Sequence, residues 1–130
     1  HFNRFESFYR AEAGGPLAWA AGIRKPDGVL PRVDRARGVV RTWEPLTRYG
    51  DNGWLGCALV VDPALVVDAV EQGGSQLLVA RTPGNGPAVW HAGSGWDRSG
   101  DFPDVAAWDR HVDAFVARLR APLVVEVVAR

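Results

Sequence analysis

The 130-residue chain lacks several sequence features, and each absence excludes some kinds of site, partner or protein class. Its single cysteine, Cys57, excludes an internal disulfide and any zinc site built from several thiolates. Lysine plus arginine balances aspartate plus glutamate at 15 each. Without a basic excess we expect neither nucleic acid nor an anionic membrane as a partner. The apolar runs are too short to cross a bilayer, so we expect no membrane span.

Two further absences concern the start of the chain. There is no methionine, so the sequence does not begin at a start codon. HFNRFESFYR alternates like a strand and lacks the charged, apolar and small-residue regions of a secretion signal. We therefore expect residues 1–130 to be a single domain that forms a piece of a longer precursor.

Short alternating or apolar segments, separated by turn-forming residues, fill most of the chain. They predict strands over residues 2–9, 17–25, 38–46, 55–62, 75–82 and 87–96. The first has aromatic residues on both faces, which favours a place inside a sheet rather than at its edge. The segment PALVVDAVEQGG is ambiguous, because its valines favour a strand and its proline can begin a helical turn.

One helix is predicted over residues 103–120. Its apolar residues fall on one helical face: Trp108, Val112, Phe115, Val116 and Leu119. Asp101 or Ser99 can cap its start, Pro122 ends it, and LVVEVV then predicts a last strand. The fold class that follows is mainly β, an antiparallel β-sandwich with one C-terminal α-helix. Strands apolar on both faces need cover on both, from stacked sheets or from sequence missing here, and we expect the latter.

Two stretches carry a resemblance to a known family. LTRYGDNGWLGCALVVDP and VWHAGSGWDRSGDFPDVAAWDRHVDAFVARLRAPLVVEV resemble the C-terminal half of a bacterial domain-of-unknown-function family. That family is similar to galactose-mutarotase-like supersandwich proteins, and its members are typically exported and encoded among pectin- and uronate-polysaccharide-degrading enzymes. The resemblance covers nearly the whole chain. GWDRSGDF, followed by the helix that holds Trp108, is its most specific part.

The resemblance implies a large two-sheet fold whose first half lies on a second chain or elsewhere in the precursor. It implies a periplasmic or secreted location, and an oligosaccharide or polysaccharide fragment as the ligand. Because mutarotase-like folds host epimerases, lyases and hydrolase modules, the resemblance leaves open whether the chain is an enzyme and of which type.

His91 and Glu44 are the candidate catalytic residues. His91 neighbours Trp90 on one strand, so the two face opposite sides of the sheet, and a neutral imidazole can serve as general acid or base. The alternative is a half-buried structural histidine. Glu44 ends a strand between Trp43 and Pro45, where partial burial would raise its pKa. The pairing of a Glu with a His on neighbouring strands would resemble mutarotase-like enzymes; otherwise Glu44 is a solvated strand end.

The candidate substrate-binding residues surround these two. Trp54 and Trp90 offer indole rings for stacking on a sugar, and Arg41 could pair with a uronate carboxylate unless an internal salt bridge holds it. Asp51 and Asn52 could bond hydroxyls, although Asp-Asn-Gly is equally a turn signature.

The acidic and histidine residues are dispersed, with no metal-binding spacing and no phosphate-binding loop, so we expect neither metal nor cofactor. Three functions stay open: a carbohydrate-active domain acting on uronic-acid-containing oligosaccharides by acid/base chemistry, a non-catalytic carbohydrate-binding module, and a structural half-domain that completes the fold of a partner chain. Asp97, Arg98 and Trp96 are predicted to be structural: Arg98 can bond loop carbonyls or Asp101 and Asp104, and Trp96 plugs the corner at the helix entry.

Overall fold

The computed structural model describes residues 1–10, 12, 14–47 and 50–126. In this part of the chain the strands are β1 (Phe2–Phe8), β2 (Leu17–Arg24), β3 (Arg32–Asp34), β4 (Val39–Pro45), β5 (Trp54–Val61), β6 (Val66–Gln72), β7 (Ser75–Thr82) and β8 (Pro87–Trp96). The helix α1 spans Val105–Arg120, and the short 3-10 turns η1 (Arg35–Arg37) and η2 (Asp97–Ser99) complete the elements.

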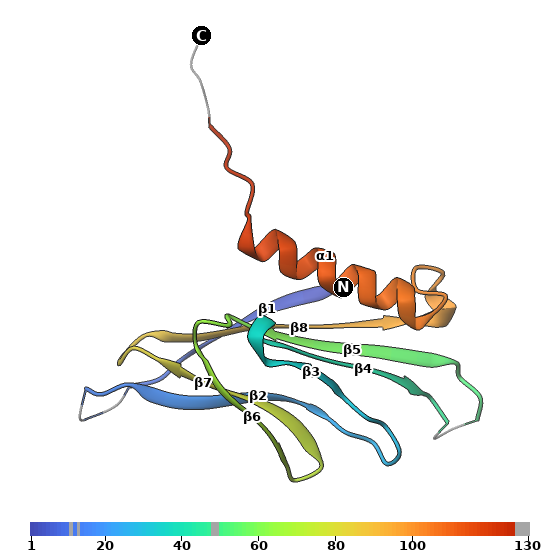
Figure 1. Cartoon of the computed structure of the whole chain (residues 1–130), viewed down its shortest axis with the longest axis horizontal. Coiled ribbons are helices and arrows are strands. Elements are labelled where there is room, and N and C mark those ends of the chain that lie inside the picture. The colour runs from blue at the N-terminus through green and yellow to red at the C-terminus, as the bar shows by residue number, and fades with distance from the viewer. Residues whose placement is uncertain (11, 13, 48–49, 127–130) are drawn as a thin grey trace.

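The strands form two antiparallel sheets that stack as a sandwich. The larger sheet has the order β1-β8-β5-β4-β3, and the smaller has the order β2-β7-β6. Helix α1 lies across the face of the larger sheet that points away from the smaller one (Figure 1). The fold class predicted from the sequence, an antiparallel β-sandwich with one C-terminal helix, is confirmed.

Two apolar cores follow from the alternation of the central strands. Leu59 and Val61 of β5 point toward the small sheet and pack with Trp19 and Leu78, whereas Val60, between them, points toward α1. The core under the helix holds the following residues: Val39, Ala58, Val60, Phe102, Trp108, Val112 and Val116. The helix and the small sheet therefore supply the two-sided cover that these strands need. Stacked sheets, the alternative that we did not favour from the sequence, provide part of that cover.

Several sequence predictions need correction. Among the described strands β1 is an edge strand beside β8 alone, not an interior strand, and most of its residues are exposed. The ambiguous segment after Pro63 forms strand β6, which pairs with β7. The short strand β3 was not predicted, because its three residues follow the turn-forming PDGVLP stretch.

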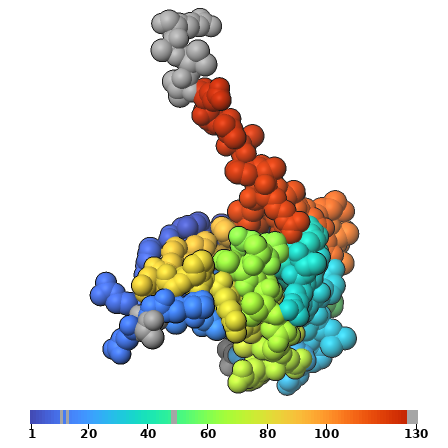
Figure 2. All heavy atoms as spheres, turned by 60° about the vertical axis from the view of Figure 1, so that its left-hand side comes forward, coloured from blue at the N-terminus to red at the C-terminus, as the bar shows by residue number. Residues whose placement is uncertain are grey.

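The C-terminal predictions also need correction. The cap of α1 is Asp104, whose carboxylate accepts a hydrogen bond from the Ala107 amide at 2.7 Å, rather than Asp101 or Ser99. Of the last predicted strand, residues 123–126 form no strand, and residues 127–128 lie outside the described part. The chain instead leads away from the body after α1 (Figures 1 and 2).

Candidate functional site

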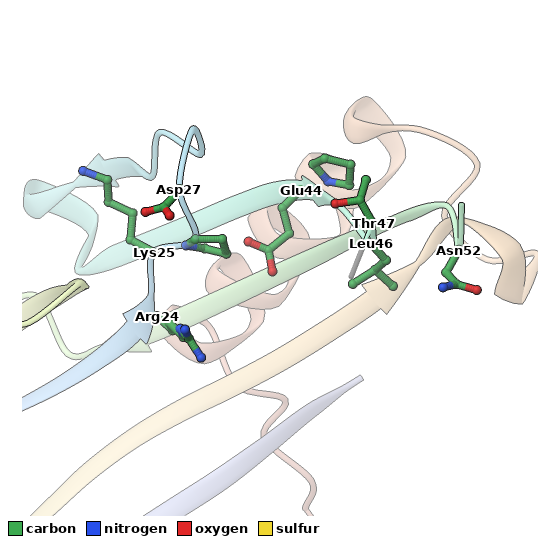
Figure 3. Close-up of a pocket in the computed structure, with 9 residues that line it drawn as sticks. Arg24, Lys25, Asp27, Glu44, Leu46, Thr47 and Asn52 are labelled. Atoms are coloured by element: carbon green, nitrogen blue, oxygen red, sulfur yellow. The ribbon is translucent and has the colours of Figure 1, made fainter. Parts of the chain in front are cut away.

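A groove of the described structure opens at one end of the sandwich, where β2 and β4 end. It has a volume of about 820 Å³ and is lined by the following residues: Arg24, Lys25, Pro26, Asp27, Glu44, Pro45, Leu46, Thr47 and Asn52 (Figure 3). The first four come from the end of β2 and the turn after it, and the others from the end of β4 and the following loop. The groove thus lies between the two sheets, with charged and polar side chains on both walls.

Glu44 is the half-buried carboxyl of this groove. It alternates with Thr42 and Val40 on the face of β4 that points toward the small sheet. Its Oε2 is buried and has no hydrogen-bond partner among the described residues. Burial raises the pKa of Glu44 above its usual 4.5, which confirms the prediction made from its setting. A carboxyl with a raised pKa and a free oxygen can donate or accept a proton.

Two cationic side chains lie on the opposite wall of the groove, one held in an ion pair and the other in none among the described residues. Lys25 Nζ donates to Glu71 Oε1 at 2.7 Å, and in Figure 3 its side chain turns away from Glu44. Arg24 is exposed and takes part in none of the ion pairs or side-chain hydrogen bonds of the described residues. Arg24 can therefore bind an anionic group that enters the groove.

The loop that carries Asn52 is held by its own hydrogen bonds. The Gly53 amide donates to Asp51 Oδ1 at 3.1 Å, and Gly53 adopts a φ of 79°, a conformation that favours glycine. Trp96 Nε1 donates to the Asn52 carbonyl at 2.7 Å, and Arg98 bonds Asp51 at 3.1 Å. The Asp-Asn-Gly stretch is thus a fixed turn that places the Asn52 side chain at the rim of the groove (Figure 3).

Two structural predictions for this corner are wrong. Arg98 pairs with Asp51 instead of an acid near the helix entry. The Trp96 side chain is 40% exposed, so it does not plug the corner, which Phe102 and Trp108 fill.

His91 lies elsewhere, on the face of β8 that points toward α1. Its ring contacts Phe115 edge-on with 5.4 Å between centroids, in a smaller hollow of about 400 Å³. The hollow is lined mostly by apolar side chains, together with Arg37, Asp62 and Arg120. Burial, and secondarily the positive charge of Arg4, lower the pKa of His91 below its usual 6.5. His91 is therefore held as a neutral imidazole at neutral pH.

The structure does not bring His91 and Glu44 together. Glu44 registers with Leu55 and His91 with Val60, residues near opposite ends of β5. Val60 belongs to the core under α1, so His91 faces the helix, whereas Glu44 faces the small sheet. Directly paired residues of neighbouring strands lie on the same face of a sheet, and successive residues of one strand lie on opposite faces. The sheet itself therefore separates the predicted acid/base pair.

The remaining predicted binding residues lie outside the groove. Trp90 packs between the sheets, stacked on Phe5 at 5.5 Å and tilted against Trp19. Arg41 faces α1, where its guanidinium bonds Asp113 at 3.2 Å and Asp109 at 3.4 Å, the internal salt bridge considered as its alternative. Trp54 is 44% exposed but does not line the groove. Glu44 and Asn52 are the predicted site residues that meet in one place.

Sequence reasoning missed Arg24, Lys25, Asp27 and Thr47, all of which line the groove. The sequence feature that points to Arg24 is its position at the end of a predicted strand, like that of Glu44. Their meeting depends on β2 joining the small sheet and packing across from β4 and β5, which the sequence does not show.

Comparison with known proteins gives a family. A family model described as a domain of unknown function, DUF4861, matches residues 1–125. The chain belongs to the DUF4861 family. No curated protein and no solved structure matches the chain. The DUF4861 description names no reaction, and membership of the family alone assigns none to this chain.

Two absences among the described residues concern metals and membranes. Among residues 1–10, 12, 14–47 and 50–126, no three His, Cys, Asp or Glu side chains cluster as metal ligands would. In the same part of the chain, α1 does not have the length and apolar character of a membrane-crossing helix.

Proposed function

We propose that this chain is a carbohydrate-active domain that binds uronic-acid-containing oligosaccharides in the groove between β2 and β4, with Glu44 transferring a proton at the bound sugar. The observation that carries the proposal is the Glu44 carboxyl itself. One of its oxygens is buried and without a partner among the described residues, and burial raises its pKa. Perturbed titratable groups in a cleft are typical of functional sites.

The charges of the groove support an acidic sugar. Arg24 has no carboxylate partner among the described residues, and a guanidinium binds a carboxylate through two parallel hydrogen bonds. Thr47 and Asn52 add a hydroxyl and an amide that suit sugar hydroxyls. A uronic acid offers both kinds of group on one ring.

The chemistry assigned to Glu44 is proton transfer. In its protonated form it donates a proton to a sugar oxygen, and in its ionised form it accepts one. A raised pKa keeps both forms accessible closer to neutrality than in an ordinary glutamate. Arg24 would hold the sugar carboxylate and so fix the ring relative to Glu44.

A non-catalytic carbohydrate-binding module is the second candidate. The separation of His91 from Glu44 on opposite faces of the sheet favours it, because acid/base catalysis at a sugar commonly uses two groups. Both candidates share the groove and the uronic-acid ligand, and they differ in whether Glu44 is needed for turnover.

The test uses oligogalacturonates beside neutral galacto-oligosaccharides of equal length. Calorimetry measures binding to wild type, Arg24→Gln and Glu44→Gln, with Arg81→Gln as a control, because Arg81 is an exposed arginine outside the groove. Mass spectrometry and anomer-resolved NMR then follow the sugars during long incubation.

We expect the acidic sugar alone to bind, Arg24→Gln to weaken binding about tenfold or more, since charge-assisted bonds are worth roughly 1.5–3 kcal/mol, and Arg81→Gln to bind normally. Turnover that Glu44→Gln abolishes without abolishing binding supports the enzyme. Binding without turnover supports the module. Equal binding of neutral and acidic sugars, or none, contradicts the proposal.

A further inference from the structure

The outer edge of β1 is an unpaired strand edge. In the larger sheet β1 ends the order, with β8 as its one neighbour among the described strands. It runs from Phe2 to Phe8, and the Phe5 side chain is 42% exposed although it stacks on Trp90. A long edge with exposed aromatic residues is a template for pairing with another strand.

A second segment of the same chain has the properties of a strand but pairs with none of the described strands. Leu123, Val124 and Val125 are 95%, 84% and 82% exposed, and with Glu126 they form no strand. Branched apolar residues of this kind favour sheets, and their exposure to water is unfavourable. Figures 1 and 2 show that the segment leads away from the body after α1, so it does not lie on the β1 edge of its own molecule.

We infer that residues 122–126 of one copy add as a strand to the β1 edge of a second copy, which makes the chain a strand-exchanged dimer. Each chain carries both the β1 edge and the 122–126 segment. When two copies exchange their segments, both β1 edges are paired and the dimer is complete. The inference does not depend on the proposed function of the groove.

The two faces of the added strand match the two faces of β1. Leu123 and Val125 alternate to one side and would cover Phe5. Val124 and Glu126 alternate to the other side, the side of Arg4 and Glu6, where the Arg4 side chain remains 53% exposed despite its bond to Glu6. One face of the contact would be apolar, and on the other Glu126 would lie near the exposed Arg4.

The test measures the molar mass of the full chain by light scattering during size exclusion over a range of protein concentrations. Wild type is compared with Leu123→Ser, with Phe5→Lys at the edge, and with Leu30→Ser. Leu30 is 82% exposed in the loop between β2 and β3, against 95% for Leu123, so Leu30→Ser removes another highly exposed leucine away from the contact. Hydrogen exchange of the β1 amides is measured on the same samples, and circular dichroism checks that each variant folds.

We expect wild type and Leu30→Ser to run at twice the mass of the monomer, with slowed exchange at β1. Leu123→Ser and Phe5→Lys should run as monomers with faster exchange there. If Phe5→Lys fails to fold, Leu123→Ser decides alone. A wild-type monomer overturns the inference, including one in which the segment protects β1 of its own molecule, and so does a dimer that Leu123→Ser leaves intact.

Discussion

At the scale of single residues, the close packing of Trp108 on the larger sheet depends on glycine. Trp108 is fully buried, and a Cβ at Gly56 would stand 2.6 Å from its Nε1. Gly56→Ala should therefore lower the free energy of unfolding by about 1–3 kcal/mol through overpacking. Urea denaturation measures the change, with Gly15→Ala as control, because a Cβ at Gly15 meets no atom within 4 Å. Equal stability of the two variants would contradict this packing.

The raised pKa of Glu44 predicts how stability depends on pH. Below about pH 4.5 the carboxyl is protonated in both the folded and the unfolded chain, so burial costs nothing. Above that pH the unfolded chain loses its proton first, so the penalty on the folded state grows until pH passes the raised pKa and keeps its full value at higher pH. Glu44→Gln should therefore gain stability relative to wild type as pH rises from 4 to 7, measured as the difference in Tm. A constant or shrinking difference contradicts the burial of this carboxyl.

The pKa of His91 is lowered, whereas that of Glu44 is raised, and this predicts where the His91 ring titrates. Because burial and Arg4 lower its pKa, its ring protons in NMR should titrate below pH 6.5. Arg4→Ala should move that titration upward, while burial, the larger cause, keeps it under 6.5. A His91 that titrates at 6.5 in wild type would show that the ring is not held under α1.

At the scale of elements, the start of α1 depends on one cap. Asp104 accepts a hydrogen bond from the Ala107 amide, so Asp104→Ala should lower the free energy of unfolding by about 0.5–2 kcal/mol. Asp101→Ala is the control, since Asp101 makes a surface contact with His1 and no cap bond. Chemical denaturation compares the two, and a larger loss for Asp101→Ala would mean that the helix begins earlier.

The sequence predicted most elements but not how they pair. Alternation showed that Trp90 and His91 face opposite sides of one strand, and helical periodicity placed Trp108, Val112 and Val116 on the buried face. Three residues of cap-forming type precede α1, and the backbone geometry at Asp104 selects among them. The edge position of β1 depends on sheet order, which local pattern does not encode.

The candidate site was predictable only in part for the same reason. The setting of Glu44 at the end of an apolar strand correctly indicated burial and a raised pKa. The side of the sheet that each residue faces depends on which layer covers it. The small sheet covers the face of Glu44 and α1 covers the face of His91, so a pairing argued from neighbouring strands could not detect their separation.

At the scale of the whole molecule, the layers create two distinct hollows. The one between the sheets holds Glu44 and the charged end of β2, and the one under the end of α1 holds His91. If the groove between the sheets is the functional site, ligand should affect one end of the sandwich and leave the helix side unchanged. The predicted strand exchange at β1 involves a further surface, so both can operate in one assembly.

The most direct test of the central claim is NMR mapping of the full chain with oligogalacturonate. We expect amide shift changes that cluster at Arg24, Asp27, Glu44, Thr47 and Asn52, and that require about ten times more ligand, or more, in Arg24→Gln. The His91 amide and the residues of α1 around it should stay unchanged. Shift changes centred on His91, or the same changes with a neutral oligosaccharide, would contradict the assignment of the groove as an acidic-sugar site.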